Sequence, residues 1–193
     1  MAQTSTSILS SKSHKSDVTG TDISFEASGS VYKITSTSTA LNNFAVRDII
    51  SVTGTVSNNK SFTVKTVTDA NELIVEEIAT TENADGSTTT TLDHVGFVSD
   101  KQKGDGYYSK PDGVHTVSYK VDATMNVEAT LKMQGSLATT PTEDDWFDVS
   151  STTPTLDQST TIFSYNFTGN FVWVRAKVQG VTAGSVENIL LNS

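Results

Sequence analysis

The chain has 193 residues, of which 35% are hydrophobic, with no cysteine and a net charge of −9. The acidic charge opposes binding to nucleic-acid phosphates, and the missing cysteines exclude disulfides, thiolate catalysis and cysteine–zinc sites. No apolar run has the length of a membrane span, and the first residues lack the features of a signal peptide, so we expect synthesis in the cytoplasm. The many serines and threonines favour strands over helices.

Residues 1–20 form a polar segment whose main apolar side chains are Ile8, Leu9 and Val18. A segment this polar buries too little surface to offset its ordering entropy. We therefore expect an extended N-terminal arm that adds a strand to a sheet edge of a neighbouring subunit. Ile8, Leu9 and Val18 are the candidate interface anchors of this arm.

Residues 21–98 consist of short alternating segments separated by turn residues. The predicted strands are 23–26, 31–35, 48–53, 61–67, 72–76 and 88–92. Strands of this length and spacing are typical of a small antiparallel barrel or a compact sandwich. The sequence therefore predicts a small β domain in this region.

Residues 99–113 carry glycine, proline and charges without apolar periodicity, which predicts a linker or a long loop. Residues 114–193 then form a larger β-sandwich with longer strands. The main predicted strands are 114–121, 127–134, 160–168, 171–179 and 185–191, and Gly169-Asn170 predicts a tight hairpin between two of them. The fold class is all-β, without a helix of standard length.

The strand at 171–179 has large side chains on both faces. Val172, Val174, Ala176 and Val178 alternate with Phe171, Trp173, Arg175 and Lys177. Tryptophan and arginine are enriched at interface hot spots, which makes Phe171, Trp173 and Arg175 candidate interface residues. The alternative is a core tryptophan with a neighbouring structural arginine.

The sequence contains no recognisable set of catalytic residues. The histidines at 14, 94 and 115 lack metal-ligand spacing and are interpreted as surface or half-buried residues. The acidic run 143–148 lacks the register of a calcium loop and is interpreted as a solvated loop. No nucleophile elbow or phosphate-binding glycine loop occurs, so we expect no enzymatic activity, no metal and no cofactor.

Two groups of segments resemble proteins of tailed-bacteriophage virions. The stretches 46–55, 58–64 and 72–76 resemble a small virion β module with the pattern GD-I-x-V-x-G-S, N-N-G-x-F-T-V and I-x-V. Arg47 stands at the usual first glycine, and Lys60 stands where a turn glycine is common. The stretches 131–136, 145–149, 171–176 and 184–186 are similar to β-sandwich domains on phage tails, necks and capsid surfaces.

This resemblance implies a non-enzymatic virion component that makes subunit contacts in the capsid surface, neck, tail or baseplate. Its partners would be other phage structural proteins and further copies in a symmetric assembly. The alternative is a carbohydrate-binding β-sandwich for host adsorption, which aromatic side chains on an exposed sheet face would favour. A third candidate, a glycan-cleaving enzyme, would need paired carboxylates in a cleft.

Overall fold

A computed structural model describes residues 5–108 and 113–192 of the chain. It confirms the all-β class, with 48% strand and 4% helix. The sheets are antiparallel, and they are not closed into a barrel. The helical residues within the described ranges are two 3-10 turns, η1 (Asp105–Tyr108) and η2 (Glu143–Asp145).

The chain divides into two compact units that do not follow each other along the sequence. Residues up to His14 and from Phe97 onward form one unit, which we name the flanking unit. Lys15–Gly96 forms the second, which we name the inserted unit because it interrupts the first. The predicted arm is therefore divided between the two units.

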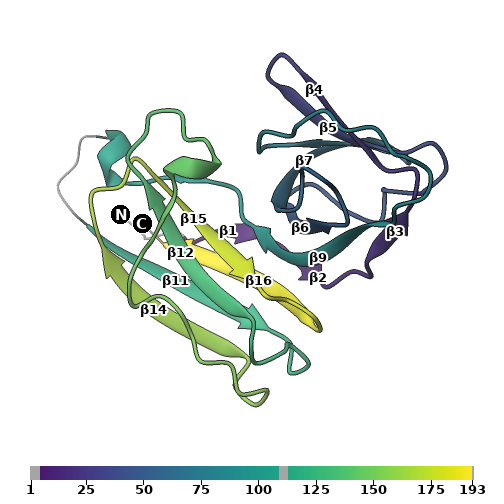
Figure 1. The fold of residues 1–193 in the computed structure, drawn as a ribbon. Helices are drawn as coiled ribbons and strands as arrows, with labels where there is room; N and C mark the ends of the chain where they lie inside the picture. Colours follow the sequence, from purple (N-terminus) through teal and green to yellow (C-terminus); the bar gives the residue numbers. More distant parts are fainter. Residues whose placement is uncertain (1–4, 109–112, 193) are drawn as a thin grey trace. The chain divides into compact units, whose positions relative to one another are not determined.

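The flanking unit contains two sheets. One sheet has the order β1-β16-β11-β14, with β2 beside β16 (Figure 1). Its strands are β1 (Thr6–Leu9), β2 (Lys12–Ser13), β11 (Val114–Val121), β14 (Ile162–Thr168) and β16 (Ser185–Asn192). In the other, β12 lies between β13 and β15, and β10 pairs with β15. These strands are β10 (Gln102–Lys103), β12 (Thr130–Ser136), β13 (Phe147–Asp148) and β15 (Trp173–Gln179).

Apolar and polar residues alternate along these strands, and the apolar ones form the core of the flanking unit. Val117 and Tyr119 of β11, Leu131 of β12 and Val174 of β15 are all 0% exposed and belong to one hydrophobic cluster. Side chains two residues apart on a strand share a face, so each sheet contributes one apolar face to this cluster. The predicted β-sandwich after residue 113 is thus completed by residues from the N-terminus.

The N-terminal segment adds a strand, as the sequence predicts, but to a sheet of its own chain. Strand β1 pairs antiparallel with β16, with Thr6 opposite Leu191 and Leu9 opposite Ile189. Ile8 and Leu9 are 3% and 6% exposed and lie in the flanking-unit core. Val18 lies in β3 (Val18–Gly20) of the inserted unit. Backbone pairing with β16 and burial of Ile8 and Leu9 therefore attach the N-terminal segment to the flanking unit.

The segment predicted as a linker is hydrogen-bonded to the flanking unit over residues 99–108. The Ser99 amide donates to the Ala176 carbonyl at 2.9 Å, and the Gly104 amide donates to the Val172 carbonyl at 3.0 Å. Between Ser99 and Gly104, strand β10 pairs with β15. Residues 109–112 of the predicted linker lie outside the described residues. Long-range pairing, which composition does not reveal, thus places residues 99–106 beside residues 171–176.

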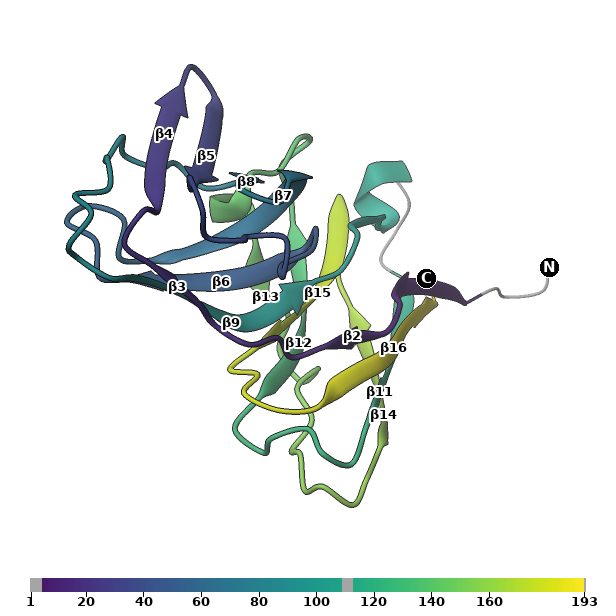
Figure 2. The ribbon, with the colours of Figure 1, turned by 90° about the vertical axis from the view of Figure 1, so that its right-hand side faces the viewer.

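The inserted unit is built around a sheet with the order β9-β6-β7-β8-β5-β4, and β3 pairs with β9 (Figure 2). Its strands are β4 (Ser24–Ser28), β5 (Val31–Thr35), β6 (Asp48–Thr53), β7 (Ser61–Asp69), β8 (Glu72–Val75) and β9 (Thr90–Val98), whose last two residues belong to the flanking unit. The core includes Phe25, Ile50, Phe62 and Leu73, each no more than 1% exposed.

The hairpin predicted at Gly169-Asn170 is wrong. Strand β14 pairs with β11, whereas β15 pairs with β12 and β10, so the connection passes between the two sheets of the flanking unit. Gly169 has a φ of 156°, and a Cβ there would lie 2.3 Å from the Phe171 ring. The glycine therefore lets Phe171 turn inward at the crossover instead of closing a two-strand turn.

Candidate interaction surface

Arg175 lies on the face of β15 opposite the core residues Val174 and Ala176, yet it is only 3% exposed. Its Nη1 and Nη2 atoms donate to the two carboxylate oxygens of Glu143, both at 2.7 Å. Its Nε donates to Oε1 of Gln134 at 3.0 Å. This bidentate ion pair fixes the guanidinium in one orientation.

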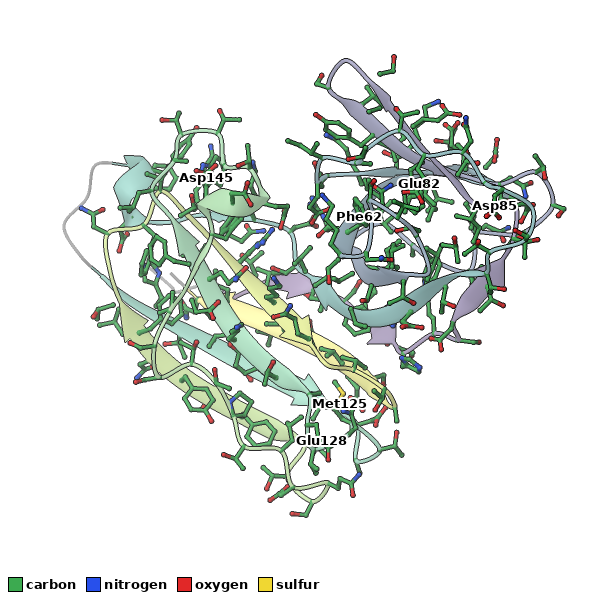
Figure 3. All side chains as sticks on the ribbon, viewed as in Figure 1. Phe62, Glu82, Asp85, Met125, Glu128 and Asp145 are labelled. Atoms are coloured by element: carbon green, nitrogen blue, oxygen red, sulfur yellow. The ribbon has the colours of Figure 1, made fainter. Side chains whose placement is uncertain are left out.

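Trp146 covers the guanidinium of Arg175. The guanidinium carbon lies 4.2 Å from the centroid of the Trp146 ring, a cation–π contact. The loop that carries Glu143 and Trp146 is closed by Asp145, which accepts hydrogen bonds from the amide and hydroxyl of Thr142, each at 2.7 Å (Figure 3). These bonds hold the pKa of Asp145 below its usual value.

The network continues from Arg175 across the sheet. Gln134 donates through Nε2 to Oδ1 of Asp148 at 2.9 Å, and Lys132 pairs with Oδ2 of Asp148 at 2.5 Å. Burial opposes ionisation of Asp148, but its bonds to Lys132 and Gln134 hold its pKa below the usual value. Lys177 lies opposite Lys132, and burial together with Arg175 lowers its pKa. The outer face of β12 and β15 is therefore a connected network of charges.

The acidic run 143–148 is largely engaged in this network. Glu143 binds Arg175, Asp145 closes its own loop, and Asp148 binds Lys132. Within the ranges that the structure describes, no group of three or more histidine, cysteine or acidic side chains could hold a metal ion. Three of the four carboxylates in this run, those of Glu143, Asp145 and Asp148, thus have structural partners.

Aromatic and lysine side chains gather beside this network. Tyr107 and Tyr108 of η1 are 41% and 55% exposed, and Trp173 of β15 is half-buried. The Tyr107 ring centroid lies 5.2 Å from that of Trp173, in an edge-on arrangement. Lys103 Nζ lies 4.1 Å from the Tyr107 ring, and Lys101 Nζ lies 4.7 Å from the Trp173 ring. We name these five residues the aromatic–lysine cluster.

Phe171, the third candidate of the predicted strand 171–179, lies just before β15 and is a core residue. It is 8% exposed, and its ring centroid lies 5.9 Å from that of Phe147 and 6.2 Å from that of Phe167. Gly135 leaves room for it, because a Cβ there would lie 2.5 Å from the ring. Phe171 therefore fills the flanking-unit core beneath the crossover.

The six candidate interface residues thus do not form one exposed patch, and Ile8, Leu9 and Phe171 lie in the same core. Ile8, Leu9, Phe171 and Arg175 are buried within the chain, whereas Val18 and Trp173 are half-buried. Contact of any of them with another subunit remains a prediction. The sequence interpretation missed Tyr107 and Tyr108, because they lie in the predicted linker. Two adjacent aromatic residues in a polar, aperiodic segment were the available signal.

Two histidines are buried instead of lying at the surface. His94 is 2% exposed, and its Nε2 lies 3.8 Å from Oδ2 of Asp48. His115 is 0% exposed and stacks on Phe167, with its Nε2 atom 3.5 Å from Oδ2 of Asp105. Each histidine therefore has an acidic neighbour within its own unit, which the sequence spacing did not suggest.

The inserted unit has a pocket of about 150 Å³ whose lining includes Ile23, Val56, Glu82, Asp85 and Thr90. The Glu82 carboxylate accepts hydrogen bonds from the amides of Val56 at 2.7 Å and Ser57 at 3.0 Å. The Asp85 carboxylate accepts bonds from Ser87 and Thr88 (Figure 3). Glu82 therefore ties its segment to the loop at 56–57, whereas Asp85 closes its own turn.

The motif around Arg47 has a specific backbone geometry. Arg47, which stands at the glycine of the virion pattern, has a φ of 75°. This left-handed conformation is one that glycine adopts without steric cost. The next residue, Asp48, is 0% exposed, accepts a hydrogen bond from the Ala45 amide at 2.8 Å and pairs with Lys15 at 2.7 Å. The turn before β6 thus places a residue with a long side chain in a left-handed conformation.

No protein-family model, curated protein or solved structure matches the chain. In the described parts of the chain, no helix has the length and apolar character needed to cross a membrane.

Proposed function

We propose that the chain is a non-enzymatic structural component of a bacteriophage virion, present in many symmetric copies and in contact with other phage structural proteins. The proposal rests on the resemblance to virion β modules and sandwiches. Most of the apolar residues that carry this resemblance are core residues, among them Ile50, Phe62, Leu131 and Val174. They therefore specify two β scaffolds, which are suited to presenting surfaces and edges to neighbours.

The observation that carries the proposal is the left-handed backbone of Arg47. A random match to the pattern would have no reason to place this conformation at the glycine position, because residues with side chains rarely adopt it. The neighbouring Asp48 is buried and bonded as part of the same turn. A left-handed residue at the position of the pattern's glycine supports the proposal, although the residue there is arginine.

The test is incorporation into particles. The purified full-length chain, labelled and mixed with capsid, neck and tail proteins from the same genome, should co-sediment with assembled particles in a fixed ratio. Particles purified from infected cells should contain the same ratio by quantitative mass spectrometry. A chain that is expressed during infection but absent from purified particles would refute the proposal.

A second candidate function, binding of host carbohydrate, is favoured by the aromatic–lysine cluster. Sugar rings stack on flat aromatic side chains, and Tyr107 and Tyr108 are both exposed. Binding to immobilised host polysaccharide should be lost in Tyr108→Ala and retained in Tyr108→Phe, which keeps the ring. Equal binding by the two variants, or none by the wild type, would dismiss this function.

A further inference from the structure

Strand β14 is a long edge strand. It ends its sheet, and among the described strands only β11 pairs with it. The pairing covers all seven residues from Ile162 to Thr168 with no shift in register. The opposite side of β14 therefore presents a straight row of backbone amides and carbonyls to a further strand.

The edge strands at the other ends of the sheets carry features that discourage such pairing, whereas β14 does not. Strand β1 has a register irregularity between Ser7 and Leu9, and β13 has only two residues. Strand β4 carries Glu26, and its Phe25 is already bridged to Glu82 by two backbone hydrogen bonds. Bulges, short length, charges and cover are the usual protections of edges. Strand β14 has no proline, glycine or charged side chain.

The order of side chains in β14 is nearly symmetric about Tyr165. Phe163 mirrors Phe167, Ser164 mirrors Asn166, and Ile162 mirrors Thr168. Phe163 and Tyr165 pack against the core, whereas Ser164 and Asn166 are exposed on the other face. In an antiparallel pair of identical strands centred on Tyr165, aromatic residues would therefore face aromatic residues and polar residues would face polar ones.

The distribution of charge along the chain also favours association at the β14 edge. The chain carries a net charge of −9, so two copies repel each other over most of their surface. No charged side chain occurs between Asp157 and Arg175 in the sequence. Strand β14 lies within this uncharged stretch, and two acidic copies can approach there with little local repulsion.

We propose that two copies of the chain associate through β14, paired antiparallel about a twofold axis at Tyr165, so that the four-stranded path of one copy continues into that of the other. The inference deepens the proposed function, since it names the edge by which copies would meet. It concerns the isolated chain, however, so it can fail or hold independently of incorporation into particles.

The experiment is light scattering on the full-length chain during size exclusion, over a series of concentrations. The wild type should reach twice the chain mass of 20.6 kDa. In the double variant S164K/N166K, each lysine would face a lysine of the second copy, so we expect about tenfold weaker association or more. Two added lysines change the net charge from −9 to −7, which by itself would reduce repulsion, so weaker association would be specific to the edge.

Two further variants sharpen the result. T66K/T68K places the same charges, at the same spacing, on exposed positions of β7 in the inserted unit and should associate like the wild type. S164E/N166E should be monomeric alone and form a mixed pair with S164K/N166K, which also shows that both variants fold. A monomeric wild type, open-ended oligomers, or a dimer unaffected by S164K/N166K would overturn the proposal. A dimer in a chain that never enters particles would refute only the virion role.

Discussion

Replacing Leu9 with alanine tests whether the N-terminal segment belongs to the fold. The composition predicts an arm that docks on a neighbour and adds little to folding. In the structure Leu9 is 6% exposed, faces the core of the flanking unit and lies opposite Ile189 of β16. Truncating a leucine buried to this degree costs about 2–5 kcal/mol, from lost transfer free energy and from the cavity left behind.

The assay is urea unfolding followed by tryptophan fluorescence, because both tryptophans, Trp146 and Trp173, lie in the flanking unit. The midpoint should fall by an amount corresponding to at least about 2 kcal/mol, which for a domain near 100 residues also lowers Tm by about 8 °C or more. Leu137→Ala is the matched control, since Leu137 is 64% exposed in the same unit and should cost less than about 0.5 kcal/mol.

Equal stability of Leu9→Ala and Leu137→Ala would refute this reasoning. It would mean that β1 does not pack on its own core in solution. The expectation drawn from composition, an arm free to engage another subunit, would then be the better description. A large loss in Leu9→Ala alone would instead establish that residues 5–14 are an integral part of the flanking unit.

Three other perturbations have expected outcomes. Glu143→Ala should destabilise the flanking unit by roughly 1–3 kcal/mol, because the buried guanidinium of Arg175 then loses its carboxylate partner. Asp144 is exposed, so Asp144→Ala should change the stability little in the same urea assay. Arg47→Gly should be about 1 kcal/mol more stable than Arg47→Ala, since both lose the side chain and only glycine relieves the positive φ; equal thermal midpoints would contradict this. The hydrogen bond from Thr39, together with those from Ser38, holds the pKa of Asp22 well below its usual value. The stability this provides is complete above the unfolded pKa of about 4 and is lost as pH falls below it, so unfolding midpoints between pH 5 and 3 should fall less in Asp22→Asn than in the wild type.

The alternation of apolar and polar residues determined most of the strands. The segment 114–121 is a strand with the predicted bounds, and Leu131 and Met133 fill the core as their period of two requires. Local backbone preferences act over a few residues, so the sequence carries them directly. The all-β class and the absence of long helices in the described ranges follow from the same local information.

Tertiary structure alone decided which strands are neighbours. The position of Leu9 depends on pairing with β16, about 180 residues away in sequence, and the orientation of Arg175 depends on Glu143. Gly169-Asn170 has the local features of a hairpin, but the flanking strands pair better with β11 and β12, and a glycine allows either course. Pairing partners are selected by the sum of many distant contacts, which no single stretch of sequence contains. For the same reason the polar first residues, unable to form a core, take part in one that the rest of the chain provides.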